Sequence, residues 1–252
     1  MSLDIISGAT ESAPKVMIYG LAGVGKSTLA SKLKRPVFFD FEGGLTYLGV
    51  NRTPQYDDIE EFLTDLLRLT KANERKFDTI VIDSADWMMR LFVEQASGIR
   101  YSGDGKERRG DKTDQTPIDV TMTLNRSNGG YGNGKQVLEN YVRSKLIRIL
   151  SKLNAKGYGI CLVAHADKKQ IMDADGVDVD QIVPKIDVNT MNVFVEWCDN
   201  VFYLKKDADD NHILLLESDS VALAKNRLGK TGEVNIDEVD INEVLKPKKG
   251  EK

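Results

Sequence analysis

A glycine-rich octapeptide near the N-terminus constrains the fold more than any other feature of the sequence. Residues 20–27 read GLAGVGKS, between a short apolar run at residues 15–20 and a helix-like run at residues 25–34. Glycines in such a loop let the backbone turn tightly and point its N–H groups at phosphate oxygens. The pattern therefore predicts a strand, a phosphate-binding turn and a helix in direct succession. The residues expected to contact the ligand are Gly20, Gly23, Val24, Gly25, Lys26, Ser27 and Thr28.

Two side chains of this loop have specific expected roles. In a G-x-x-x-x-G-K-[ST] loop the lysine reaches the β- and γ-phosphates of a nucleoside triphosphate, and the hydroxyl that follows binds Mg²⁺. We therefore assign these roles to Lys26 and Ser27, and we expect ATP and Mg²⁺ as ligands. The alternative is a chance glycine-rich turn, which the flanking strand and helix patterns disfavour.

Apolar runs and helical periodicity alternate along the rest of the chain. Strands are expected at residues 15–20, 37–40, 79–83, 159–165, 200–204, 213–217 and 220–225. Helices are expected at residues 25–34, 58–72 (with Asp57 as N-cap), 85–96, 135–153 and 188–197. This alternation predicts an α/β fold with a mainly parallel twisted sheet, helices on both faces and an antiparallel C-terminal edge.

Length and composition favour one soluble domain. The chain has 252 residues, of which 41% are hydrophobic and 29% charged, as is usual for a globular α/β protein. We expect a flexible arm at residues 1–13, the domain at 14–236, and an acidic then basic tail at 237–252. The polar stretches 97–134 and 166–187 are expected as mobile loops within the domain.

Charge and cysteine content restrict the class of protein further. The 35 basic and 39 acidic residues give a net charge of −4, which excludes a chain coated in basic charge but permits a local nucleic-acid groove. Cys161 and Cys198 stand in apolar runs, so we interpret them as buried thiols of a cytoplasmic protein. The longest apolar runs are too short for a membrane span.

Polar residues stand at the ends of three expected strands. Asp83 ends TIVID, where a carboxylate beside the phosphate loop could hold Mg²⁺ or its water shell. The alternative is that it caps the helix that follows, a role that Ser84 could equally fill. Glu42 follows the second strand and could orient the attacking water, or be a solvated loop acid. His165 ends the fourth strand and could sense the γ-phosphate, or be a satisfied structural residue.

Two polar segments are candidates for contact with DNA. The first, residues 98–113, contains Tyr101, which could stack on a base, and its cations are Arg100, Lys106, Arg108, Arg109 and Lys112. A solvated charged loop is the alternative for this segment. The second, residues 166–187, offers Lys168 and Lys169, but its acids Asp173, Asp175, Asp178 and Asp180 would repel phosphate.

Four motifs in a fixed order resemble one family. GLAGVGKST, FFDFEGGL, TIVIDS and CLVAHAD together look like the RecA-type ATPase core, most like the compact phage ATP-binding proteins that include single-strand annealing recombinases. The segment NGGYGNG at residues 128–134 resembles the phage group as well. The resemblance implies that Glu42 is the catalytic glutamate and that His165 occupies the place of the γ-phosphate sensor.

A segment near the C-terminus resembles a second element of RecA and DnaB-type helicases. AKNRLGKTG at residues 224–232 is similar to their Lys-x-Lys or Lys-x-Arg element, whose cations reach a neighbouring subunit's ATP. The resemblance thus implies that Lys225 and Arg227 act across an interface in a homo-oligomeric ring or filament. Two exposed cations beside a turn at Gly229 are the alternative.

The resemblance also implies an activity. We expect a DNA-stimulated ATPase that acts on single-stranded DNA in phage-type recombination, annealing or replication, with a single-strand binding protein as a further partner. A DnaB-like motor and a nucleotide-gated assembly switch without DNA remain open as alternatives. A small-molecule kinase is disfavoured by Glu42 and the Lys225/Arg227 pair, which suit hydrolysis between subunits.

Overall fold

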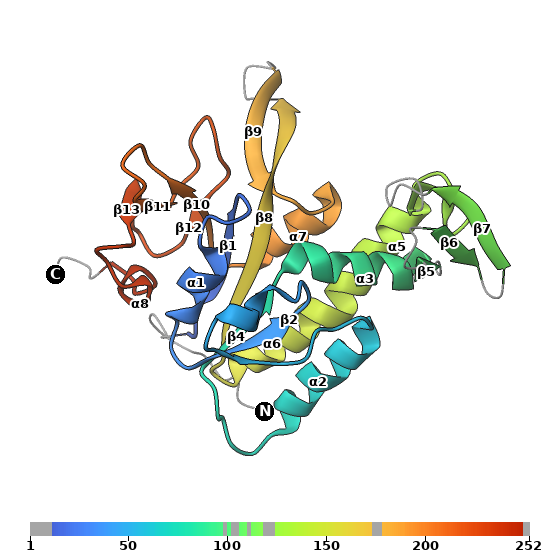
Figure 1. Cartoon of the computed structure of the whole chain (residues 1–252), viewed down its shortest axis with the longest axis horizontal. Coiled ribbons are helices and arrows are strands. Elements are labelled where there is room, and N and C mark those ends of the chain that lie inside the picture. Colours follow the sequence, from blue (N-terminus) through green and yellow to red (C-terminus); the bar gives the residue numbers. More distant parts are fainter. Residues whose placement is uncertain are drawn as a thin grey trace, which may run out of the picture.

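A single large sheet organises the computed structural model, which describes residues 12–97, 100–101, 106–109, 112–117, 124–172 and 178–248. The strand order is β13-β11-β10-β1-β8-β4-β2-β3, with β12 beside β10 and β9 beside β8 (Figure 1). The strands are β1 (Lys15–Gly20), β2 (Pro36–Asp40), β3 (Asn51–Arg52), β4 (Thr79–Asp83), β8 (Gly159–Met172), β9 (Asp178–Pro184), β10 (Asn200–Lys206), β11 (His212–Leu215), β12 (Lys225–Asn226) and β13 (Glu233–Asn235).

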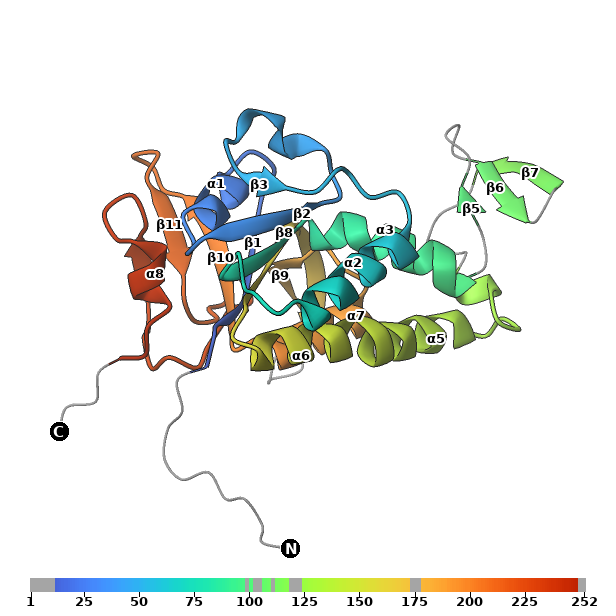
Figure 2. The same ribbon diagram turned by 90° about the horizontal axis from the view of Figure 1, so that it is seen from below.

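Helices cover both faces of this sheet, as Figure 2 shows. One face carries α1 (Lys26–Ser31), the turn η1 (Gly44–Tyr47) and α8 (Ile241–Val244). The other carries α2 (Ile59–Lys71), α3 (Ala85–Ser97), α5 (Asn133–Tyr141), α6 (Arg148–Ala155) and α7 (Val188–Trp197). Alternate residues of β1 therefore enter different cores: Val16 and Ile18 pack beside α1, and Met17 and Tyr19 pack on the opposite face.

The predicted sheet is confirmed as mainly parallel. Neighbouring strands are parallel from β10 through β1, β8, β4 and β2 to β3. At the C-terminal edge, β11 pairs antiparallel with β10, and β13 pairs antiparallel with β11. The carboxyl ends of the parallel strands consequently lie along one edge. There Gly20 is opposite His165, and Asp83 is opposite both Asp40 and Val163.

The long helix expected at residues 135–153 runs in three parts. α5 passes through a π-helical turn, Val142–Ile147, into α6. The predicted apolar stripe is buried throughout: Leu138, Val142, Leu146, Ile149 and Leu153. At the start of α2 the N-cap is Asp58 rather than Asp57, because the Asp58 carboxylate accepts hydrogen bonds from the N–H groups of Glu60 and Glu61.

Within the segment 166–187, expected as a loop, residues 166–172 and 178–184 pair as the two strands of a β-hairpin. β8 continues through Met172 and pairs antiparallel with β9, so the hairpin extends beyond the sheet (Figure 1). Its outer residues are exposed or half-buried and lack the apolar alternation that marks a strand packed on a core. The strand expected at 220–225 is reduced to β12, and β3 and β13 were not expected.

The basic segment is described only in part. β5 (Arg100–Tyr101), β6 (Lys106–Arg109) and β7 (Lys112–Pro117) form a separate three-stranded sheet, seen beside the end of α3 in Figure 1. The predicted roles of Arg100, Tyr101, Lys106, Arg108 and Arg109 rest on side chains outside the described residues. Among the described residues, no helix is both long and apolar enough to cross a membrane.

Candidate active site

A cavity of about 330 Å³ opens where the parallel strands end. Its lining combines the glycine-rich loop with polar residues from β2, β4 and β8, because these strands end at the same edge of the sheet. The residues that line it are Gly23, Gly25, Lys26, Ser27, Thr28, Asp40, Glu42, Gly44, Leu45, Leu48, Asp83 and His165. All three strand-end residues predicted from the sequence are thus brought to the predicted phosphate loop.

The glycines of the loop are required by its geometry. Gly23 and Gly25 have φ angles of 76° and 90°, in the left-handed region that favours glycine. A Cβ atom added at Gly20 would lie 2.4 Å from the carbonyl oxygen of Leu204, so this glycine permits close packing of β1 against β10. Gly20 and Val24 do not line the cavity, and Val24 is buried in the core beneath the loop.

Lys26 is buried at the N-terminus of α1. Its Nζ donates a hydrogen bond of 2.8 Å to the carbonyl oxygen of Leu21 within the same loop. Burial lowers the pKa of this amine below its usual range, while the nearby Asp83 carboxyl acts in the opposite direction. A bound polyphosphate would offset the cost of burying the ammonium, which is the function expected of a phosphate-loop lysine.

Ser27 and Asp83 form an oxygen-rich corner suited to Mg²⁺. The Ser27 hydroxyl hydrogen-bonds the Asp83 carboxyl, and burial still raises the pKa of that carboxyl to about 6. The Oδ2 atom of Asp83 is buried and has no hydrogen-bond partner among the described residues. A hydroxyl and a carboxylate with an unused oxygen are hard ligands of the kind Mg²⁺ prefers, so these residues fit the metal.

Glu42 is held by a turn that the sequence analysis did not identify. The Oδ1 atom of the buried Asp40 accepts hydrogen bonds from the backbone N–H groups of Glu42 and Gly43, at 3.1 and 2.7 Å. The N–H of Asp40 in turn donates to the Thr53 hydroxyl. Asp40 therefore fixes the turn that places the Glu42 carboxylate in the cavity. The sequence signal for this role is the acidic residue Asp40 itself, two positions before Glu42 in FFDFE.

His165 is clamped by one carboxylate, that of Asp86 at the start of α3. The Asp86 carboxylate accepts a hydrogen bond of 3.1 Å from the backbone N–H of His165. Its Oδ2 atom also lies 3.0 Å from Nδ1 of the His165 ring. The opposite ring nitrogen, Nε2, lies 3.8 Å from Oε1 of Glu42. Because the carboxylate holds Nδ1, Nε2 is the atom presented to the cavity and to Glu42. Asp86 was not identified from the sequence.

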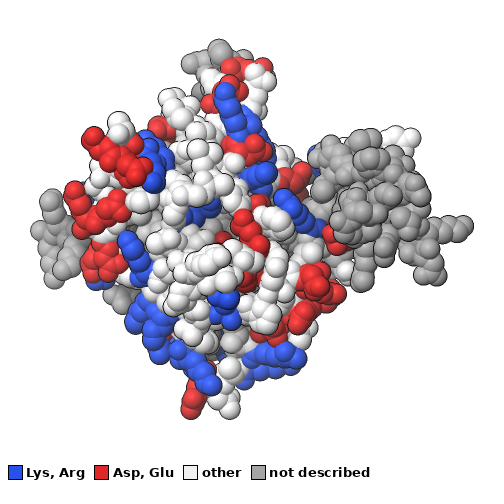
Figure 3. Space-filling view, viewed as in Figure 1, with Lys and Arg blue, Asp and Glu red and all other residues white. Residues whose placement is uncertain are grey.

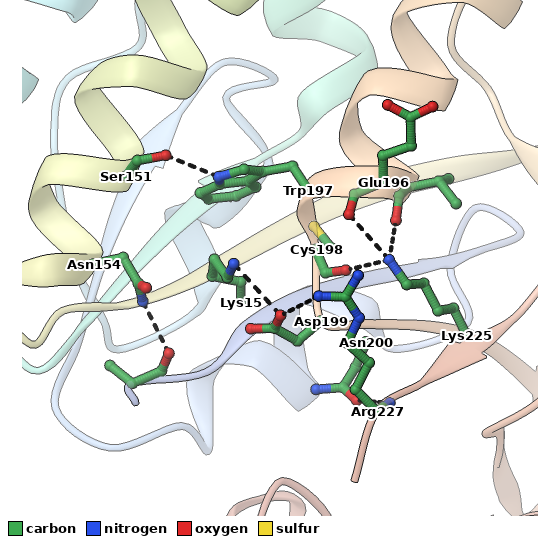
Figure 4. Close-up of polar contacts among 12 residues, drawn as sticks. Lys15, Ser151, Asn154, Glu196, Trp197, Cys198, Asp199, Asn200, Lys225 and Arg227 are labelled. Atoms are coloured by element: carbon green, nitrogen blue, oxygen red, sulfur yellow. Dashed lines mark hydrogen bonds and ion pairs between the residues drawn. The ribbon is translucent and has the colours of Figure 1, made fainter. Parts of the chain in front are cut away.

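Lys225 and Arg227 lie at the opposite edge of the sheet, near Lys15 at the start of β1 (Figure 4). Lys225 donates to the carbonyl oxygens of Val195, Glu196 and Cys198, at 2.7, 3.1 and 2.8 Å, at the end of α7. Those bonds use all three donors of its ammonium group.

Lys225 therefore has a role within its own chain, whereas the exposed Arg227 makes one 3.3 Å ion pair, with Asp199. The length of β1 alone separates this edge from the phosphate loop by about 16 Å. Neither cation is brought to its own chain's cavity, which fits both a role on a neighbour and the alternative of two cations outside the site. Only Arg227 retains donors free to act on a neighbour.

Three further predicted residues within the described ranges, Lys168, Cys161 and Cys198, are not part of the cavity lining. Lys168 pairs with Asp180 across the β8–β9 hairpin, with Nζ 2.6 Å from Oδ2, so this acid neutralises a predicted DNA-binding cation. Both cysteines are buried and free, and burial raises the pKa of each thiol. In the described part of the chain no group of three or more His, Cys, Asp or Glu side chains could hold a metal ion.

Comparison with known proteins identifies the family of the chain. The chain is 23% identical over 229 residues to the SPbeta prophage-derived uncharacterized protein YorG of Bacillus subtilis (strain 168). That alignment covers 86% of this chain and 60% of the relative, so the chain spans less than two thirds of the relative's length. The family model described as AAA domain matches residues 12–228, which include the whole cavity. The chain therefore belongs to the AAA domain family of P-loop ATPases.

Proposed function

We propose that this protein is a RecA-type ATPase that binds ATP and Mg²⁺ and couples ATP hydrolysis to single-stranded DNA in phage-type recombination, annealing or replication. The AAA domain match supports nucleotide binding, and the prophage origin of the relative is consistent with a phage process. Within the cavity, Lys26 would bind phosphates, Ser27 and Asp83 would hold Mg²⁺, and Glu42 would orient water. His165 would report the presence of the γ-phosphate.

One observation supports the coupling to DNA: Asp86 connects the first cavity, through its hydrogen bond to His165, with a second cavity. Besides clamping His165, it lines a second cavity of about 470 Å³ between α3, the start of α5 and the base of the β8–β9 hairpin. Any displacement of His165 on loss of the γ-phosphate would therefore move a side chain in the wall of the second cavity. A residue that connects the two cavities in this way is what nucleotide-dependent binding of a second ligand requires.

The second cavity has a suitable chemistry for a nucleotide of a single strand. Its floor is apolar, with Met89, Val93, Leu124, Leu138 and Ile186. Its rim carries the cations Arg90, Lys135, Lys169 and Lys185. Apolar surface beside basic side chains suits a base with its phosphates.

The lining also carries three acids, Asp86, Asp167 and Asp187, which offset part of this basic charge. Lys135 lies 3.9 Å from Asp187, and Lys169 donates to the carbonyl oxygen of Ile186 at 2.7 Å. On the face drawn in Figure 3, acidic and basic side chains are intermixed, so this cavity rather than a broad basic surface is the proposed DNA contact.

The proposal is tested by the salt dependence of oligonucleotide binding. The double variant Lys169→Ala/Lys185→Ala should bind labelled oligo(dT) more weakly, and the log–log salt slope should fall by about 1.4, or about 0.7 for each lost contact. The matched control, Lys145→Ala/Lys152→Ala, removes two exposed lysines from the π-helical turn and α6, outside the lining of the second cavity. Equal affinity and slope in the two double variants would exclude the second cavity as the DNA site.

ATP turnover distinguishes the proposal from its alternatives. Oligo(dT) should stimulate phosphate release by the wild-type protein. An unstimulated, slow turnover would favour a nucleotide-gated switch without DNA, and ATP-driven unwinding of a forked duplex would favour a DnaB-like motor. Stimulation without unwinding, together with annealing of complementary strands, is the result expected for the proposed role.

A further inference from the structure

The two histidines of the chain are held in the same way, at opposite sides of the phosphate loop. His165 lies beside the cavity on β8, clamped by Asp86. His212, the first residue of β11, donates its backbone N–H to Oδ2 of Asp237 at 2.8 Å, and its Nδ1 lies 3.0 Å from both carboxylate oxygens of Asp237. In each case one aspartate fixes the backbone and the ring together.

The clamp leaves the other nitrogen of His212 directed at the loop. A Cβ atom added to Gly25 would lie 3.3 Å from Nε2 and 3.4 Å from Cδ2 of His212. No hydrogen bond engages Nε2 within the part of the chain that the structure describes, and about 29% of the side chain is exposed. The pKa of the Asp237 carboxyl is lowered, first by the N–H of His212, so an ionised carboxylate faces Nδ1 and fixes the ring orientation.

The position of His212 in the sheet indicates which end of a nucleotide it could reach. Glu42, Asp83 and His165, expected at the γ-phosphate, come from β2, β4 and β8, on one side of β1. His212 comes from β11, on the other side of β1, and its ring fills the space that a Cβ atom at Gly25 would face. A nucleotide with its γ-phosphate among the first group would extend away from it past the loop, toward His212.

We infer that His212, held by Asp237, contacts the bound nucleotide at its sugar and α-phosphate end. The inference rests on the proposed nucleotide site and adds a binding residue to it. The neutral ring with its proton on Nδ1 would accept a hydrogen bond from a ribose hydroxyl through Nε2, and the protonated ring would donate one to a phosphate oxygen. Neither contact involves the γ-phosphate, so His212 contributes equally to binding of a nucleoside di- and triphosphate.

His212→Asn separates this role from a structural one. The asparagine amide can still donate to Asp237 from the place of Nδ1, but nothing replaces Nε2. We expect affinity for Mg²⁺–ADP and for the Mg²⁺ complex of a β,γ-imido ATP analogue to fall by the same factor, about tenfold, as for one lost hydrogen bond. Isothermal titration calorimetry measures both affinities, with nucleotides that carry an unmodified ribose. The melting temperature should stay within a degree or two of wild type, while His212→Ala should lower it.

A control variant and a variant of Asp237 complete the test of His212. Asp209→Asn alters an exposed residue of the neighbouring β10–β11 turn and should leave both affinities unchanged. Asp237→Asn keeps the imidazole but removes its ionised partner, and should give a smaller loss than His212→Asn. Unchanged affinity in both His212→Asn and Asp237→Asn, or a loss confined to the triphosphate analogue, would overturn the inference. A wild-type protein that binds neither nucleotide would instead contradict the proposed function.

Discussion

Replacing Asp83 by asparagine should stabilise the nucleotide-free protein while abolishing its chemistry. Burial raises the pKa of the Asp83 carboxyl from 3.8 to about 6, so at neutral pH the folded chain holds a buried carboxylate that the unfolded chain would expose to water. A difference of about two pKa units, at about 1.36 kcal/mol each, corresponds to about 3 kcal/mol. The asparagine side chain has the same shape without the charge, so Asp83→Asn should recover stability of this order.

The sign of the pH dependence follows from the direction of the shift. Below pH 4 the carboxyl is protonated in both the folded and the unfolded chain, so wild type and Asp83→Asn should be about equally stable. Between pH 4 and 6 the unfolded chain loses the proton while the folded chain keeps it, and the wild type loses stability relative to the variant. Above pH 6 the full difference should be present.

Urea denaturation from pH 4 to 8 without nucleotide or Mg²⁺ measures this difference. The control is Asp78→Asn, just before the start of β4, where Arg35 and neighbouring cations lower the pKa of the Asp78 carboxyl to about 2. That variant should be less stable than wild type by a nearly constant amount across this range, because the Asp78 carboxyl is ionised in both the folded and the unfolded chain above pH 4. An Asp83→Asn protein less stable than wild type at pH 7.5, by an amount independent of pH, would refute the reasoning.

Further variants test individual residues of the site. Lys26→Ala should abolish tight ATP binding in calorimetry without loss of folded structure by circular dichroism; unchanged affinity would remove Lys26 from the site. Glu42→Gln should bind ATP but release phosphate about 10²–10⁴-fold more slowly, and wild-type turnover would leave Glu42 a loop acid. Asp86→Asn should bind ATP and oligo(dT) but lose the stimulation of ATP turnover by DNA. Full stimulation would show that Asp86 does not connect the two cavities. Mixing Arg227→Ala with Glu42→Gln should partly restore turnover if Arg227 acts on a neighbour; no rescue at any mixing ratio would place it outside the active site.

Much of the site could be predicted because its residues carry local signals. The phosphate loop is a contiguous motif, and β1 and β4 have the predicted bounds because each is a short apolar run closed by a glycine or an acid. Parallel strands share one carboxyl edge, so residues after three such runs were expected to converge. The cavity brings Glu42, Asp83 and His165 together on that basis.

The side chains that support this site had no comparable signal. Asp86 looks like an ordinary acid in the first turn of a helix, and its bond to His165 joins residues 79 positions apart. His212 and Asp237 are separated by 25 positions, with a turn and two strands between them. Lys225 resembles an exposed cation in the sequence, and only the fold places it at the end of α7. Such pairings depend on tertiary structure, which periodicity and spacing do not encode.

The central claim is that this cavity hydrolyses ATP and that single-stranded DNA governs the rate. Steady-state phosphate release by the wild type and by Glu42→Gln, with Mg²⁺–ATP in the presence and absence of excess oligo(dT), tests it most directly. We expect Mg²⁺-dependent turnover that rises with oligo(dT) in the wild type and is lost in the variant under both conditions. Equal phosphate release by the two proteins, or wild-type turnover that oligo(dT) leaves unchanged, would contradict the account.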